Sequence, residues 1–287
     1  MFGTSLEDGL PGLLHIRDRT AARFSQTPVR IAFTSKIIRR IWQGRAADPD
    51  YGGLHPEVPE EILHVRSMEE ELLELLEEGH DSFVVQPVHI APAGKGIDAG
   101  SLLNGLSAMK TGLPPIRAIV FGRPALGGDD PASPYGDDPV VAARALFRDA
   151  TLARREGAAL YYMGHGNRKY ATGRVYNALA VEMRRQYPDI TTVISLIEEG
   201  SGFDETVAEL KGQKVKKIVL KPCMIAAGNH VWKDMAGDGP GSLQARLEAE
   251  GFTVVPVFRG LGEEDAFADI FVRHAADAAR DAGIELR

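Results

Sequence analysis

The feature that most constrains the fold is a repeat relating the two halves of the chain. Val84–Ala91 (VVQPVHIA) aligns with Val219–Ala226 (VLKPCMIA) at an offset of 135 residues, with four identities. The same offset places Val120 on Val255 and Leu126-Gly127 on Leu261-Gly262. Because separate segments share one offset, we predict that the two halves fold into similar units.

Apolar runs typical of buried strands alternate with segments of helical periodicity. The strand-like runs are Val29–Ser35, Phe83–Ala91, Ile116–Gly122, Leu160–Asn167, Val193–Glu199 and Ile218–His230; the helical segments are 13–24, 36–42, 68–78 and about 94–112. Ser67 and Glu70 have the spacing of a capping box before the helix at Met68, and residues 45–59 have the prolines and glycines of a surface loop. Alternating strands and helices predict parallel sheets covered on both faces.

We therefore predict an α/β fold of two similar lobes, each a parallel sheet flanked by helices, facing each other across a cleft. The predicted lobes are residues 1–137 and 138–287, and the last helix can pack on the first lobe. Phe2-Gly3-Thr4-Ser5 resembles the end of a strand whose body is absent from this numbering, so the first lobe is expected to have a truncated first strand.

Composition excludes several classes of protein. The 287 residues have a net charge of -7, which argues against general nucleic-acid binding because phosphates require a basic face. Neither an apolar run long enough to span a membrane nor a secretory signal is present. The lone Cys223 fits a reducing cytoplasm and is expected to be a small, buried side chain.

Two histidines follow strand-like runs directly. His165 stands in the Gly-His-Gly turn after LYYM, and His230 ends the run that begins at Ile218; between them, Val193–Glu199 runs into two carboxylates. In an open parallel sheet, ligands bind at the carboxyl ends of the strands. Imidazole and carboxylate groups form a mixed nitrogen and oxygen set suited to divalent first-row metals.

Each histidine also has a simpler interpretation. Alone, His165 could bond a carbonyl in its turn and His230 could cap a helix, but the pair with a carboxylate between them favours a site. His89 lies inside a predicted strand and fits a core residue equally well. The remaining histidines are expected at the surface: His15, His55, His64, His80 and His274.

The motifs FGTS, FTSK, VVQPVHI, MGHGN and especially KPCMIAAGNHVWKDMAGD resemble those of the anaerobic cobalt chelatases, the sirohydrochlorin cobaltochelatases of cobalamin biosynthesis. The resemblance covers nearly the whole chain. It implies an ATP-independent class II chelatase, a lyase in which a tetrapyrrole lies in the cleft and two histidines with a glutamate bind the metal. Co²⁺ is then the substrate metal, with Fe²⁺ or Ni²⁺ as alternatives, and no organic cofactor is expected.

Carried over to this chain, the metal-binding and catalytic residues are His165, Glu198 and His230. Glu199 is the alternative acid, because the family's Glu-Gly-Tyr-Pro turn is replaced here by Glu198-Glu199-Gly200-Ser201. That change also puts substrate contacts near Glu198 in question. His165 would accept a pyrrole proton, while His230 and Glu198 would hold and release the ion.

Further residues are expected to contact the tetrapyrrole. They are Thr4, Ser5, His89, Gly164, Gly166 and Lys233, with Gly228 leaving room for the ring and Arg123 and Lys95 as further cations for its carboxylates. Surface charge is an equally good interpretation of each cation. The open alternatives are a sirohydrochlorin ferrochelatase of sirohaem synthesis and a tetrapyrrole-binding or metal-binding protein without turnover. A homo-oligomer is also possible.

Overall fold

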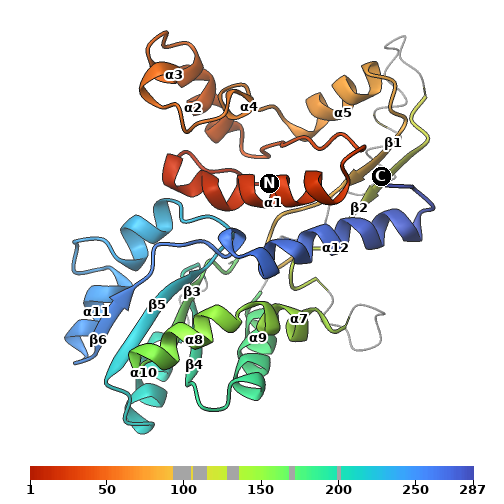
Figure 1. Cartoon of the computed structure of the whole chain (residues 1–287). Helices are drawn as coiled ribbons and strands as arrows, with labels where there is room; N and C mark the ends of the chain where they lie inside the picture. The colour runs from red at the N-terminus through yellow and green to blue at the C-terminus, as the bar shows by residue number, and fades with distance from the viewer. Residues whose placement is uncertain (93–104, 106–114, 128–135, 168–171, 199–201) are drawn as a thin grey trace.

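Parallel β-sheets flanked by helices form the framework of the chain in a computed structural model (Figure 1). The structure describes residues 1–92, 105, 115–127, 136–167, 172–198 and 202–287. Within them, β1 and β2 form one sheet, and four strands in the order β4-β3-β5-β6 form the other. The α/β class predicted from the alternation of strands and helices is confirmed.

The four-stranded sheet belongs to the C-terminal half. Its strands are β3 (Ala159–Gly164), β4 (Thr192–Leu196), β5 (Lys217–Cys223) and β6 (Thr253–Pro256), and all pair in parallel. Leu160 and Tyr162 pack into one core cluster, whereas Tyr161 and Met163 pack into another. Successive β3 side chains thus enter cores on opposite faces of the sheet, which explains why the strand is apolar throughout.

Helices contribute buried residues to both of these core clusters. Residues of α7 (Asp138–Ala145), α8 (Phe147–Glu156) and α9 (Gly173–Gln186) join the cluster that contains Leu160. Residues of α10 (Phe203–Gly212), the π-helical turn η2 (Val231–Met235) and α11 (Leu243–Ala249) join the cluster that contains Tyr161. The sheet is therefore covered on both faces, as the alternating pattern predicts.

The N-terminal half contains shorter strands than predicted. β1 covers only Ser82–Val85 of the expected run to Ala91, and β2 covers Ala118–Phe121. β1 stops pairing with β2 at the repeat position where β5 stops pairing with β6, but β5 continues to Cys223 because it also pairs with β3. Val29–Ser35 is reduced to one bridge, between Ala32 and Arg66.

The internal repeat is visible in the register of the strands. β1 pairs with β2 from Ser82↔Ala118 to Val85↔Phe121, and β5 pairs with β6 from Lys217↔Thr253 to Leu220↔Pro256. Each pair in the first set becomes a pair in the second when 135 is added to both numbers. The hydrogen bond from Gly122 N to Val85 O likewise has its counterpart from Val257 N to Leu220 O. The repeat predicted from the sequence is confirmed for these strand pairs.

Helices dominate the rest of the N-terminal half. They are η1 (Glu7–Gly9), α1 (Leu10–Arg23), α2 (Lys36–Ala46), α3 (Tyr51–Leu54), α4 (Glu60–Leu63) and α5 (Met68–Glu77). The capping box of α5 is confirmed, because Ser67 and Glu70 bond each other's backbone N–H. The predicted loop at 45–59 contains the short helix α3. The predicted helix at about 94–112 lies outside the described residues, apart from Gly105.

The C-terminal helix α12 (Asp265–Asp281), which follows η3 (Leu261–Glu263), packs against α1, β1 and β2 (Figure 1). A buried ion-pair cluster anchors it: Arg123 bonds Asp138 and Asp277, each at 2.8 Å, and His274 bonds Asp138 at 3.1 Å. The expectation that His274 lies at the surface is wrong, since its side chain is fully buried. Its acidic partner is far away in sequence and so gave no local signal.

No helix among the described residues is both long and apolar enough to cross a lipid bilayer.

Candidate active site

The three residues predicted to bind the metal follow the carboxyl ends of three neighbouring strands. β3 lies between β4 and β5, and its last residue, Gly164, pairs with Leu196 on one side and Cys223 on the other. His165 follows β3 directly, Glu198 follows β4, and His230 follows β5 after a longer loop. The connection from β4 to β5 crosses β3, so this edge is the topological switch point at which open parallel sheets bind ligands.

His165 and His230 are in direct contact. Their ring centroids lie 4.8 Å apart with the rings at 86° to each other, an edge-to-face arrangement. The side chain of His165 is exposed, and that of His230 is 43% exposed. Two imidazoles from separate strand ends are thus adjacent and accessible from solvent.

Hydrogen bonds fix which nitrogen of each imidazole is available. Nδ1 of His165 lies 2.9 Å from the carbonyl oxygen of Gly166, and Nδ1 of His230 lies 2.6 Å from a carboxylate oxygen of Asp234. Both partners are acceptors, so each Nδ1 is the donor and carries a proton. In the neutral tautomer, Nε2 of each ring then keeps a lone pair for a metal ion or a proton.

The backbone of Glu198 is hydrogen-bonded to the backbone of His165. The Glu198 N–H donates to the His165 carbonyl oxygen at 2.8 Å, which continues the β3–β4 ladder past its last paired residues. The donor atoms of Glu198, His165 and His230 do not all lie within 4.8 Å of one another. The alternative acid, Glu199, lies outside the described residues.

The N-terminal loop lies against the loop that leads to His230. Thr4 is buried, and its Oγ1 would lie 3.5 Å from a Cβ placed on Gly228. That oxygen accepts a hydrogen bond from the Leu6 N–H at 3.2 Å, while the indole of Trp42 donates to the Thr4 carbonyl at 2.8 Å. Ser5 follows in the same loop and is half-buried. The residues predicted at this rim from the two halves of the chain are therefore neighbours.

Two of the predicted glycines have clear backbone roles. A Cβ on Gly164 would lie 2.7 Å from Leu196 Cδ2 and 2.9 Å from Tyr176 Cε1, so close packing of β3 against β4 and α9 requires glycine there. Gly166 has φ of 73°, a left-handed conformation that glycine adopts without strain. Contact of either glycine with a tetrapyrrole stays a prediction.

The other residues predicted to contact the tetrapyrrole differ from one another in burial and in their partners. Burial lowers the pKa of His89 to about 4, so this imidazole is neutral at physiological pH. Lys233 is exposed in η2, close in sequence to His230. Arg123 instead forms the buried ion pairs with Asp138 and Asp277, and Lys95 lies outside the described residues. Among these cations, Lys233 is the one that lies within a few residues of His230 along the chain.

The sequence reasoning missed Asp234. It lies four residues after His230, a spacing that places side chains on one face of a helix, and it bonds Nδ1 of that histidine. The spacing was visible in KPCMIAAGNHVWKD. A carboxylate bonded to a ligating histidine commonly sets the tautomer and orientation of the ring.

Comparison with known proteins identifies relatives over nearly the full length. The cobalt chelatase (CbiK) family matches residues 1–280. The sirohydrochlorin cobaltochelatase CbiKC of Nitratidesulfovibrio vulgaris is 31% identical over 277 residues, 96% of this chain and 88% of the relative. The sirohydrochlorin cobaltochelatase of Salmonella typhimurium is 26% identical over 280 residues, 96% of this chain and 93% of the relative.

Proposed function

Because the chain belongs to the cobalt chelatase (CbiK) family, we propose that it inserts Co²⁺ into sirohydrochlorin at the site formed by His165, Glu198 and His230. The observation that carries this assignment is the contact between His165 and His230, with the Nδ1 proton of each ring fixed by an acceptor. Two Nε2 lone pairs at one strand edge can bind a single divalent ion.

The reaction exchanges pyrrole protons for the metal ion. As Co²⁺ binds the ring nitrogens, the pyrrole N–H groups release their protons, so the site needs a base as well as ligands. His165 is the more exposed imidazole and follows β3 directly. Once the ion passes to the macrocycle, its Nε2 lone pair is free, and we assign His165 as the acceptor of one pyrrole proton, while the other proton passes to solvent. His230 and Glu198 hold the ion before transfer, because nitrogen and oxygen donors bind first-row divalent ions without trapping them as thiolates would.

Sirohydrochlorin carries peripheral carboxylates that need positive or N–H partners. Lys233 and the backbone N–H groups at Thr4 and Ser5 are the groups we assign to them, since Thr4 packs beside Gly228 in the loop before His230. A cleft between the two halves would hold the macrocycle and distort it, so that a nitrogen lone pair points toward the ion. Binding energy that distorts the ring in this way lowers the barrier to insertion, because it stabilises the transition state more than the bound substrate.

The experiment is steady-state insertion of Co²⁺ into sirohydrochlorin, followed by absorbance. His165→Ala and His230→Ala are each expected to lower kcat by about 10²-fold or more, the usual contribution of a positioned base. His64→Ala is the matched control, because His64 is exposed and lies outside this strand edge. Insertion by both active-site variants at the parent rate would refute the assignment.

Two further measurements separate the alternatives. The pH profile of kcat is expected to lose an inflection in His165→Ala, and an unchanged profile would exclude its role as the base. Parallel assays with Co²⁺, Fe²⁺ and Ni²⁺ determine metal preference, and a clear preference for Fe²⁺ would indicate sirohaem synthesis instead of cobalamin synthesis. Absence of turnover by the parent protein with any of these ions would leave only a binding function.

A further inference from the structure

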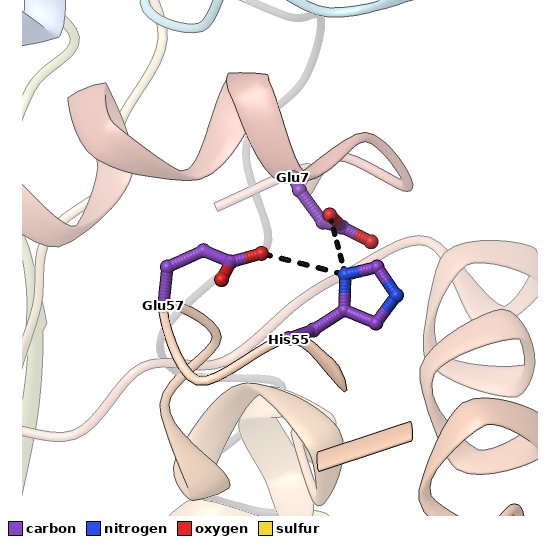
Figure 2. A group of neighbouring side chains, drawn as sticks. All are labelled: Glu7, His55 and Glu57. Carbon is purple, nitrogen blue, oxygen red and sulfur yellow. Dashed lines mark hydrogen bonds and ion pairs between the residues drawn. The ribbon is translucent and has the colours of Figure 1, made fainter. Parts of the chain in front are cut away.

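A second group of metal-binding side chains lies in the N-terminal half. Glu7, His55 and Glu57 each offer a donor atom, and these atoms lie within 4.8 Å of one another (Figure 2). Among the described residues this is the only group of three or more histidine, cysteine or acidic side chains that meets that limit. None of the three belongs to the strand edge that carries His165 and His230.

Short turns bring the three side chains together. Glu7 begins η1, directly after the Thr4-Ser5 loop, and His55 ends the one-turn helix α3. The His55 carbonyl accepts a hydrogen bond from the Val58 N–H at 3.1 Å, and the turn closed by this bond presents Glu57 to the same imidazole. Figure 2 shows Nδ1 of His55 facing both carboxylates.

The spacing of the donor atoms suits one ion. Nδ1 of His55 lies 3.0 Å from Glu7 Oε2 and 3.4 Å from Glu57 Oε1. Metal bonds of about 2.1 Å at octahedral or tetrahedral angles place neighbouring ligand atoms about 3.0–3.4 Å apart. Both imidazole–carboxylate spacings therefore match those around one ion bound in place of the Nδ1 proton.

Neighbouring groups orient two of the donors. The Tyr51 hydroxyl donates to Glu7 Oε1 at 2.5 Å, which leaves Oε2 directed at the imidazole, and the Tyr51 ring stacks on His55 with centroids 4.3 Å apart. Arg45, whose guanidinium lies 5.5 Å from the Tyr51 ring centroid, is the nearby cation, and the two carboxylates outweigh its charge. Glu57 is 59% exposed, so an ion can enter from solvent.

We propose that Glu7, His55 and Glu57 form a second binding site for a divalent first-row transition ion, separate from the insertion site. One imidazole and two carboxylates match the nitrogen and oxygen preference of Co²⁺, Ni²⁺ and Zn²⁺. Solvent molecules complete the coordination on the side of the exposed Glu57. The inference does not depend on the roles of His165, Glu198 and His230.

The test uses the full chain carrying His165→Ala and His230→Ala, so that ions bound at the insertion site are removed from the count. Equilibrium dialysis against Co²⁺ is expected to find about one ion per chain in this background. Adding His55→Ala should abolish that binding, whereas adding His64→Ala should leave it unchanged. His64 is the matched control, because it ends α4 as His55 ends α3 and is exposed.

A thermal measurement distinguishes a metal site from a structural ion pair. Co²⁺ should raise the Tm of the background protein, because an ion that binds only the folded state stabilises it. Glu57→Gln, a change at an exposed side chain, should remove that rise while leaving the metal-free Tm close to the parent value. The proposal would be overturned if the chain carrying His165→Ala and His230→Ala bound no Co²⁺, or if it still bound Co²⁺ after His55→Ala was added.

Discussion

The backbone N–H of Glu198 donates a hydrogen bond to the carbonyl oxygen of His165 at 2.8 Å. This bond fixes the turn after β4 against the turn after β3, so the main chain of Glu198 cannot move independently of the main chain of His165. Glu198 as the acidic ligand stays a prediction, which matched variants of the two neighbouring glutamates can test.

Glu198→Gln removes the charge and keeps the size of the side chain. We expect it to weaken Co²⁺ binding by at least the roughly 10-fold to 100-fold that loss of an outer-shell partner costs. The measurement is a Co²⁺ titration of the folded protein in a His55→Ala background, which removes the proposed second site, with Glu199→Gln as the matched change one residue along. A loss in Glu199→Gln without a loss in Glu198→Gln would assign the ligand to Glu199.

Asp234 is expected to act through His230. Asp234→Asn keeps the shape of the side chain but replaces the charged acceptor at 2.6 Å with a neutral amide, which weakens its hold on the Nδ1 proton. We expect Co²⁺ affinity to fall by about 10-fold to 100-fold, seen as a raised KM for Co²⁺ with a smaller change in kcat.

Asp238→Asn is the control for Asp234, because Asp238 is an exposed aspartate in the following loop. A double-mutant cycle of Asp234→Asn with His230→Ala should show that the two effects are not additive, since Asp234 works only through the ring. Full additivity would contradict a positioning role.

The repeat and the strand edge were predictable because they depend on local patterns. The apolar run before His165 and the shared offset of Val84–Ala91 with Val219–Ala226 are properties of short segments, and the strand pairs follow them in register. Asp234 was equally predictable from its spacing to His230. These features need no knowledge of distant contacts.

The features that sequence reasoning missed depend on residues far apart in the chain. His274 is buried because Asp138, 136 residues away, accepts its hydrogen bond. His55 is held by Glu7, 48 residues away. The strands of the first half are short because they lack partners: β1 pairs with β2 alone, whereas β5 pairs with both β3 and β6, and Ala32 forms a single bridge, with Arg66. No periodicity encodes such pairings.

The buried cluster around Asp138 is expected to make stability depend on pH. Burial alone would raise the pKa of Asp138, but hydrogen bonds from His274 and Arg123 outweigh it, and the net shift is downward. A carboxyl whose folded pKa is lowered contributes stability that is present above its unfolded pKa, about 3.9, and is lost as pH falls through the folded pKa.

Asp138→Asn should therefore lower the free energy of unfolding at neutral pH. We expect a loss of about 3 kcal/mol, the lower end of the cost of breaking a buried ion pair, because the largely buried Arg123 keeps Asp277 as its other charged partner. Urea unfolding at neutral and acidic pH measures this, and the difference from the parent should shrink in acid. A constant difference at both pH values would contradict the linkage.

Asp269→Asn is the control, because Asp269 pairs with Arg19 at a half-exposed position of α12. This change should alter the free energy of unfolding by about 1 kcal/mol or less.

The thiol of Cys223 is expected to be unreactive in the folded protein. It is fully buried at the end of β5, and burial, reinforced by the charge of Asp149, raises its pKa to about 12. Relative to an ordinary thiol pKa of 9.0, this leaves about 10³-fold less thiolate at mildly alkaline pH, before access is considered. Iodoacetamide should therefore label the protein only after unfolding, and mass spectrometry of native and denatured samples measures the difference.

Cys223→Ala should keep Co²⁺ insertion, since the side chain only fills space in the core. Rapid labelling of the native protein, or loss of insertion in a folded Cys223→Ala variant, would show that the thiol has a chemical role at the adjacent strand edge.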